Sequence, residues 1–487
     1  MRARATFAGG RRAERILLGG AVVLGAVLRL TALDARGWWR DEAVTVRLLR
    51  LPFDELLRTI PDSEGSPPLY YVLAWVWTRL FGDSEVGLRS FSALVGTVTV
   101  VVVYLAGRDL VSKRAGIVGA YLTAASPLLV WHGQDSRSYA LLVLTGALSF
   151  LFFVRLRRTA TLLDALGFGL VSALAVLTHY FAVFLVVPEV LWLLLASRTR
   201  RLALAPAAIV AIVGIALVPL VAAQRGNVSW VSEVPRSRRV LEVVQELLVG
   251  PQAPWERPTT VLAGLLAAAA LFVLGWRGSR DEWRAVLPAA AIGLAALVLP
   301  LLVALGGFDY LLGRNVIIAW VPLTLVVAAA LTTRRAGRAG LAVACALIAL
   351  GIGVVVGSAA TPKFGAEDWR GSARALGPAP AGGRAIVLWP PEGADAFRLY
   401  RPTARLLPAS GESVQQVVVV TLGDRRRNAA LRAALAPPRP PFREVEREDA
   451  AHFSLARFAT ARGFLVTPDV LATPPTGVAR PAVLVER

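Results

Sequence analysis

Eleven long apolar stretches dominate this sequence, and short polar connections separate them. Each stretch holds about 17 residues or more, the length that an α-helix needs to cross the hydrocarbon core of a bilayer. Hydrophobic residues make up 56% of the chain, which is more than an ordinary soluble domain contains. The stretches cover residues 16–33, 89–107, 115–131, 138–154, 162–178, 181–197, 203–223, 258–276, 285–305, 316–333 and 339–358. We therefore expect an all-α polytopic membrane domain with about eleven transmembrane helices.

The placement of arginine predicts the direction of these spans. Basic residues gather near the N-terminus and in the connections 108–114, 155–158, 198–201, 277–284 and 334–338. Cytoplasmic loops carry an excess of Lys and Arg, and these connections share one side only if the shorter stretch 67–81 does not span. We expect the N-terminus inside, 67–81 as a helix on the membrane surface, and the C-terminus outside. The net charge of +20 then reflects topology and does not indicate a nucleic-acid partner.

The composition changes after residue 358. Residues 359–487 are rich in Pro, Arg and Gly and contain no spanning stretch. Short apolar runs predict strands at 385–389, 417–421 and 463–467, and helices are predicted at 394–400 and 427–435. We therefore expect a membrane domain over 1–358, with a first external loop at 34–88, and a small extracytoplasmic α/β domain over 359–487. Cys345 is the single cysteine, so the chain cannot form an intramolecular disulfide.

The stretch 38–42 (Trp-Trp-Arg-Asp-Glu) follows the first span by a few residues. Indole rings favour the level of the lipid headgroups, so this stretch is expected at the membrane surface. Two adjacent carboxylates, Asp41 and Glu42, could act there as a base for a substrate that is partly lipid. The simpler alternative is that these charges mark the end of a helix.

Three short external turns contain the other unusual polar residues. The turn 132–139 reads His-Gly-Gln-Asp-Ser-Arg-Ser-Tyr, and the turns 178–180 and 306–315 contain His179 and Arg314. Ionisable groups near the membrane are costly, which favours a functional role. The alternatives remain an ion pair between the acidic and basic residues of the first turn, a histidine that only packs, and an arginine that contacts a membrane lipid phosphate.

An ordered set of these features resembles a known family. An acidic pair after the first span, Pro-Pro-Leu-Tyr-Tyr at 67–71 and an acidic-x-Arg-x-Tyr turn at 135–139 resemble the GT-C membrane glycosyltransferases of family 39, the protein O-mannosyltransferase type. Bacterial aminoarabinose transferases and Rgt-type sugar transferases are similar too, as is Asp-Trp-Arg at 368–370. The resemblance covers residues 14–200 well. One position departs from it, because His or Lys commonly precedes the two prolines and this chain has Ser66.

The resemblance implies roles for individual residues. Asp41 would be the catalytic base for an acceptor hydroxyl, with Glu42 and Asp135 as its catalytic partners. Arg137 and Arg314 would bind the donor phosphate, because a guanidinium stays charged and binds phosphate with two hydrogen bonds. The residues expected to contact substrate are Trp39, Tyr70, Tyr139, His179 and Tyr180.

The function implied is an inverting glycosyltransferase at the extracytoplasmic face of the plasma membrane. It would move a sugar from a polyprenyl-phosphate donor to a hydroxyl of a protein, lipid or glycan of the cell envelope. The external His, Asp and Glu residues lack the spacing of a metal site, so no metal or other cofactor is expected. The alternatives are a transporter or flippase of a lipid-linked glycan and an inactive relative. Transporters place ionisable groups within their spans, whereas Asp164 and Glu189 are expected here near the ends of theirs.

Overall fold

A computed structural model describes the chain except residues 1, 228–230, 232–233, 362–366, 424–440 and 472–479. The chain divides into two compact units. The first unit contains Met1–Leu33 and Leu51–Ala359, and the second contains Asp34–Arg50 and Ala360–Arg487. Part of the first external loop, including the stretch 38–42, thus belongs to the same unit as the C-terminal tail.

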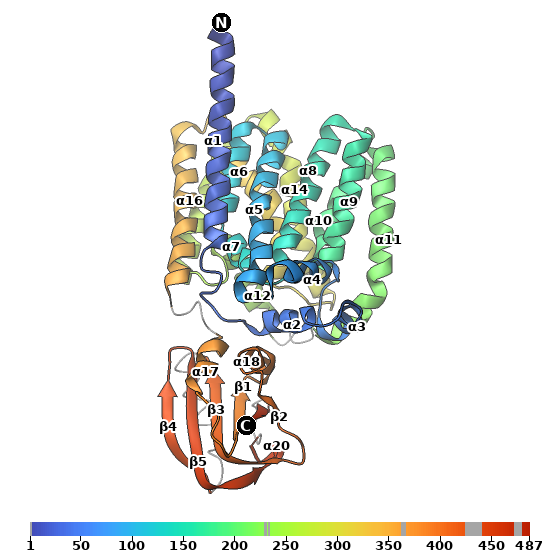
Figure 1. Cartoon of the computed structure of the whole chain (residues 1–487). Coiled ribbons are helices and arrows are strands. Elements are labelled where there is room, and N and C mark those ends of the chain that lie inside the picture. The colour runs from blue at the N-terminus through green and yellow to red at the C-terminus, as the bar shows by residue number, and fades with distance from the viewer. Residues whose placement is uncertain (1, 228–230, 232–233, 362–366, 424–440, 472–479) are drawn as a thin grey trace. The chain divides into compact units, whose positions relative to one another are not determined.

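The first unit is helical, and every apolar stretch lies in a helix or a helix pair (Figure 1). These helices are α1 (Arg2–Leu30), α5 (Glu85–Leu110), α6 (Lys113–Ala125), α7 (Pro127–Gly133), α8 (Tyr139–Thr159), α9 (Leu162–Thr178), α10 (Val183–Leu195), α11 (Arg200–Gln224), α13 (Glu256–Arg277), α14 (Arg280–Leu305), α15 (Trp320–Leu331) and α16 (Gly337–Ala360). Among the described residues, six helices are long and apolar enough to cross a membrane, or seven if α6 and α7, bent by 58°, form one span. The chain is therefore a multi-pass membrane protein.

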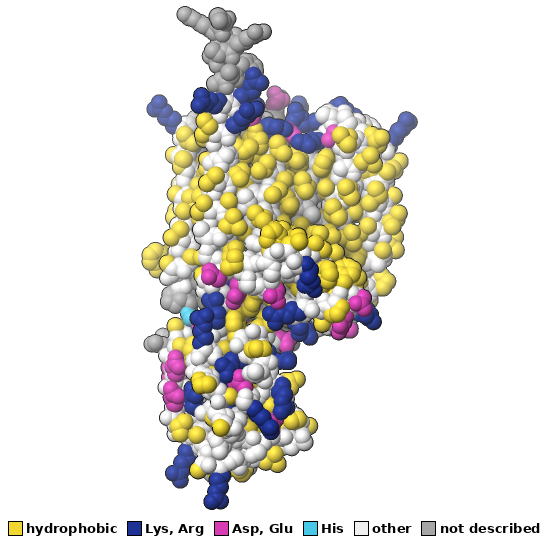
Figure 2. Space-filling model, in the orientation of Figure 1, with side chains coloured by type: hydrophobic (Ala, Val, Ile, Leu, Met, Phe, Trp, Pro, Cys, Tyr) yellow, Lys and Arg dark blue, Asp and Glu magenta, His cyan; other side chains and the backbone are white. Residues whose placement is uncertain are grey.

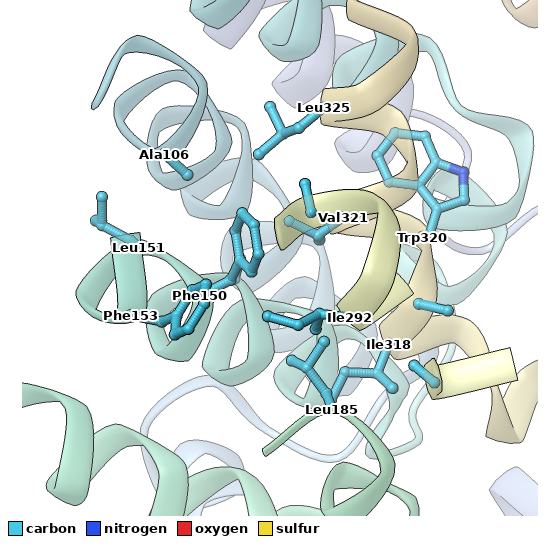
Figure 3. Packing of buried hydrophobic residues seen from close by; sticks show 14 of the residues in the cluster. Ala106, Phe150, Leu151, Phe153, Leu185, Ile292, Ile318, Trp320, Val321 and Leu325 are labelled. Carbon is cyan, nitrogen blue, oxygen red and sulfur yellow. The ribbon is translucent and has the colours of Figure 1, made fainter. Parts of the chain in front are cut away.

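Helix α8 forms the centre of this unit. Its apolar window is 78% buried, whereas that of α11 is only 11% buried, so α11 presents most of its surface to lipid. Figure 3 shows Phe150 and Phe153 of α8 close to Val321 of α15. Yellow apolar side chains cover the sides of the helical unit, and dark blue basic side chains gather at the end from which α1 projects (Figure 2).

Three shorter helices also belong to this unit, namely α3 (Phe53–Ser63), α4 (Leu69–Phe81) and α12 (Arg236–Val249). Helix α4 has 13 residues and is about 20 Å long, which is too short for a hydrocarbon core of about 30 Å. It buries Tyr70, Tyr71 and Ala74 and exposes Val76 and Leu80 on its other face. Figure 1 shows α4 lying across the long helices at the end opposite the N-terminus.

The second unit is built on a six-stranded sheet with the order β2-β6-β1-β3-β5-β4. Strand β1 (Arg384–Trp389) runs parallel to β3 (Glu412–Leu422), and the other pairs are antiparallel. The remaining elements are β2 (Arg405–Leu406), β4 (Arg443–Asp449), β5 (Phe453–Val466), β6 (Ala482–Glu486), α2 (Arg40–Leu49), α17 (Trp369–Ala375), α18 (Ala394–Tyr400) and α20 (Pro468–Leu471). The three predicted strands and the predicted helix 394–400 are present, and the predicted helix 427–435 lies outside the described residues.

Candidate active site

Arg137 forms a buried ion pair with Glu64. Both terminal nitrogens of the guanidinium donate to the two carboxylate oxygens at 2.8 Å, and the side chains are 10% and 3% exposed. Removing two charges from water is costly unless each has a partner in good geometry. The two parallel hydrogen bonds between Arg137 and Glu64 provide that geometry. Glu64 was not among the predicted site residues, although it lies only three residues before Pro-Pro-Leu-Tyr-Tyr at 67–71.

The hydroxyl groups beside this ion pair come from Ser66 and Tyr71. Their oxygens are 3.2 Å apart, and the Tyr71 ring is fully buried at 5.4 Å from the Tyr70 ring. Burial raises the pKa of Tyr71 well above its ordinary value, and the charges of Arg137 and Glu64 both act on it. The phenol therefore stays neutral.

The turn that carries Arg137 is fastened to the first helix. The side-chain amide of Gln134 donates to the carbonyls of Leu28 and Thr31 at 3.1 and 2.9 Å. Within the turn, His132 Nδ1 lies 3.5 Å from Asp135 Oδ2, and the Asp135 side chain is 1% exposed. The Asp135 carboxylate is therefore surrounded by protein, and any effect on sugar transfer would be indirect, through the residues that it contacts.

His179 lies among the predicted site residues. Its ring is 5.9 Å from the Tyr139 ring, and its Nδ1 accepts a hydrogen bond from the backbone N–H of Phe181 at 3.2 Å. Burial, together with the positive charges of Arg137 and Arg314, lowers the pKa of His179 to about 3. The imidazole is therefore neutral at physiological pH, with its proton on Nε2. The charges of Arg137 and Arg314 therefore act on the same imidazole.

Helix α12 packs against the turn Gly313–Asn315, which contains Arg314. Asp309 accepts from Arg239 at 2.7 Å and from Arg236 at 3.0 Å, which ties the turn 306–315 to this helix. The Glu246 carboxylate fills the space above Gly313 that a Cβ would occupy. Burial raises the pKa of Glu246 to about 7, although Arg314 opposes this shift. No feature of the sequence around Glu246 indicates this contact with Gly313, so it was not foreseen.

Tyr180 is engaged with helix α11. Its hydroxyl donates to Gln224 Oε1 at 2.7 Å, and Gln224 Nε2 donates to the carbonyls of Ser66 and Ile60 at 3.2 and 3.4 Å. This chain of bonds holds the segment between α3 and α4 against the long helices. Tyr180 thus acts as a tether here, and its predicted contact with substrate stays a prediction.

Asp41 and Glu42 begin helix α2 in the second unit. Acidic residues in a first turn are stabilised by the helix dipole, so the alternative of a helix end describes their position equally well. Glu42 is completely buried, whereas Asp41 is partly exposed. Of the two carboxylates, only Asp41 is accessible in this structure, which favours it over Glu42 as the base.

Side chains from the tail hold the stretch 38–42 in place. The backbone N–H and Nε of Arg40 donate to Glu367 at 3.1 and 2.8 Å, and the backbone N–H of Trp38 donates to the Tyr400 hydroxyl at 2.7 Å. Trp39 is the N-cap residue of α2. The tail therefore holds the segment that carries the predicted base. The sequence does not indicate that Glu367 and Tyr400 make these contacts.

The Asp-Trp-Arg motif has a structural explanation within the same unit. Asp368 caps α17 by accepting from the backbone N–H of Gly371 at 2.7 Å. Trp369 is fully buried in a cluster that includes Ala43 of α2, and Arg370 donates to the carbonyls of Asp34 and Ala35 at 2.8 and 3.2 Å. The motif thus fastens the segment 34–43 to the tail.

The structure therefore distributes the predicted residues over both units. The first unit holds Tyr70, Asp135, Arg137, Tyr139, His179, Tyr180 and Arg314, and the second holds Trp39, Asp41 and Glu42. In the described parts of the chain, no group of three or more His, Cys, Asp and Glu side chains could hold a metal ion.

Comparisons with known proteins place this geometry in context. Residues 65–223 match the family described as dolichyl-phosphate-mannose-protein mannosyltransferase. A search of curated proteins finds no significant match. The crystal structure of ArnT from Cupriavidus metallidurans in the apo state is 15% identical, with a TM-score of 0.57, covering 92% of this chain and 98% of that one. The same protein bound to undecaprenyl phosphate is 12% identical, with a TM-score of 0.54, covering 91% and 97%. The predicted resemblance is thus confirmed, and the chain is similar to GT-C membrane glycosyltransferases of the family 39 type, in sequence over 65–223 and in fold over most of its length.

Proposed function

We propose that this chain is an inverting glycosyltransferase that uses a polyprenyl-phosphate sugar and glycosylates a hydroxyl of a cell-envelope acceptor. The polyprenyl phosphate is itself a good leaving group, so the reaction needs a base for the acceptor and fixed positive charge for the departing phosphate. Asp41 would take the proton of the acceptor hydroxyl, and direct attack on the anomeric carbon would invert it. A polyprenyl-phosphate donor is in keeping with the undecaprenyl phosphate bound by the ArnT structure.

The observation that carries this proposal is the pair of arginines that act on His179. Arg137 is held by Glu64, and Arg314 belongs to the turn Gly313–Asn315, which packs against α12, so the protein itself positions both residues. Fixed charges stabilise a developing phosphate charge without the cost of reorganisation. The neutral Nε2–H of His179 would add one donor. The experiment is to incubate the purified protein with polyprenyl-phosphate hexoses and pentoses and to measure acceptor-dependent release of polyprenyl phosphate.

The position of Glu189 corrects an expectation from the sequence and favours the transporter alternative. Glu189 was expected near the end of a span, but it lies in the middle of α10 and is completely buried. Its Oε2 accepts from the Ser149 hydroxyl at 2.5 Å, and Ser149 lies 2.9 Å from the Ser172 hydroxyl. Buried acids of this kind occur in transport pathways, where they relay protons or bind cargo.

Replacing Glu189 by Gln separates the two functions. If the protein is a glycosyltransferase, Glu189 lies outside the proposed reaction, and Gln keeps its size and one acceptor. We therefore expect sugar transfer within about fivefold of the parent, since a neutral hydrogen bond is worth about 1 kcal/mol. Transfer and the movement of a fluorescent lipid-linked glycan across vesicles are measured in parallel, with Ser172→Ala as the matched control. Movement of the glycan by the parent that is lost in Glu189→Gln would favour a transporter.

The proposed topology places the N-terminus in the cytoplasm and the site and tail outside, at the plasma membrane. Single cysteines at Arg201, in the basic connection before α11, and at Ser413, in β3, test this in a Cys345→Ala background. We expect an impermeant thiol reagent to label position 413 on intact cells and position 201 only after the membrane is opened. Labelling of both positions in intact cells, or the reverse order, would contradict the arginine-based orientation.

A further inference from the structure

A concave site lies at the basic end of the first unit, where α6 begins. It is a groove of about 1130 Å³ between α1, α6, α15 and α16. Pockets for drug-sized ligands usually measure about 300–1,000 Å³, so this groove has room for a larger molecule. Figure 2 shows dark blue side chains at this end of the unit.

The groove combines an apolar wall with a basic rim. The wall consists of aliphatic side chains from all four helices, and the rim consists of arginine and lysine side chains. The wall includes Leu17, Ile117, Leu331 and Leu341, and the rim includes Arg11 and Arg114. Such a lining suits a ligand that has an anionic head and hydrocarbon chains.

The rim keeps a positive charge after its internal pairing. Glu14 is the one acidic residue of the lining, and Lys113 already pairs with it at 2.6 Å, while the Tyr104 hydroxyl also donates to it. Within the described part of the chain, Arg11 and Arg114 form no ion pair within 4 Å. The backbone N–H of Arg334 donates to Glu282 at 2.9 Å, which fixes that residue at the rim. The cations outnumber the acids at this groove.

Thr333 adds an independent sign of a ligand. It lines the groove between α15 and α16 and is 5% exposed. Its hydroxyl is buried without a hydrogen-bond partner among the described residues. Leaving a buried hydroxyl unpaired is costly, so the groove holds one unused polar group beside its cations.

We propose that this groove binds an anionic phospholipid of the surrounding leaflet. The phosphate would accept from the Arg114 and Arg334 side chains and from the Thr333 hydroxyl, and the acyl chains would lie along the aliphatic wall. Basic pockets between transmembrane helices recognise anionic headgroups in this way. The site is separate from the proposed sugar-transfer site, so its existence does not depend on that function.

Lipid exchange into the purified full-length protein tests the proposal. Fluorescent phosphatidylglycerol and phosphatidylcholine are titrated into the detergent-solubilised protein, and binding is measured by energy transfer from tryptophan. We expect the parent to prefer phosphatidylglycerol. Each cation near an anionic lipid is worth about fivefold in affinity, so Arg114→Gln with Arg334→Gln should lose roughly 20- to 30-fold. Thr333→Val, which keeps the shape, should lose about fivefold.

The matched control is Arg200→Gln with Arg201→Gln, which removes the same charge from the same end of the unit but does not line the groove. If both double variants lose the same affinity for phosphatidylglycerol, the preference arises from general surface charge and the proposal is overturned. Equal binding of the two lipids by the parent would overturn it as well. A short-chain polyprenyl phosphate that displaces phosphatidylglycerol at equal concentration would assign the groove to the donor lipid instead.

Discussion

Replacing Asp41 by Asn is expected to lower the turnover of sugar transfer by about 10²- to 10⁴-fold, the range that general-base catalysis typically contributes. Asn keeps the size of the side chain and its position in the first turn of α2 but cannot accept the proton of an acceptor hydroxyl. Because the loss concerns proton transfer, it should appear in kcat, and binding of the donor should change little. The measurement is steady-state release of polyprenyl phosphate at varied donor and acceptor concentrations.

Glu42→Gln is the matched control for this prediction. Glu42 is adjacent in sequence and completely buried, so it serves as a positioning residue and its replacement should cost less turnover than Asp41→Asn. Thermal unfolding of both variants shows whether the helix start survives. If the two variants lose activity equally while both remain folded, the base cannot be assigned to Asp41. If neither loses activity, the stretch 38–42 is only the start of a helix.

Arg137→Lys is the second prediction with a large effect. Lys keeps the positive charge but loses the fork that now meets both oxygens of Glu64. A hydrogen bond to a charged group contributes about 1.5–3 kcal/mol. Losing one correctly placed N–H group should therefore reduce kcat/KM for the polyprenyl-phosphate sugar by roughly 10- to 100-fold. The same change at Arg79, which lies over the Trp75 ring of α4 at 4.2 Å, is the control and should leave transfer within about twofold, as for an exposed stacking contact.

The partner residue distinguishes a phosphate ligand from a structural ion pair. Glu64→Gln keeps one acceptor for Arg137 and should cost much less than Arg137→Lys if the guanidinium contacts the donor. If both substitutions reduce kcat/KM and the unfolding temperature by similar amounts, Arg137 and Glu64 only hold the turn 132–139 in place. Activity of Arg137→Lys within about twofold of the parent would lead to the same conclusion.

The sequence predicted the helices well because their signal is local. Eleven apolar runs of spanning length gave the positions of the long helices, and the arginine clusters predicted that 67–81 would not span. Strand β1 was also foreseen from its short apolar run, and helix α18 coincides with the helix predicted at 394–400. The number of membrane crossings stays a prediction, because length and composition support six or seven of them in the part of the chain that the structure describes.

The partners of the site residues could not be predicted, because they are contacts between distant parts of the chain. Nothing near Arg137 in the sequence shows that Glu64, 73 residues away, is its partner. Similarly, Glu367 holds Arg40 from a position 327 residues further along. Likewise, nothing in the sequence shows that Glu246 lies against Gly313, since helical periodicity reports which face is apolar but not what the polar face contacts. Residue types and motifs therefore suggested the chemistry, whereas the supporting ion pairs required coordinates.

An experimental structure of the full chain with a bound polyprenyl phosphate tests the central proposal most directly, since that proposal joins Asp41 of one compact unit with Arg137 of the other. We expect the phosphate to lie within hydrogen-bond distance of Arg137 or Arg314. We also expect the Asp41 carboxylate to face the same cavity, because a base must meet the acceptor hydroxyl at about 3 Å or through one water. An Asp41 carboxylate that is about 15 Å or more from the bound phosphate could not act as this base and would contradict the proposal.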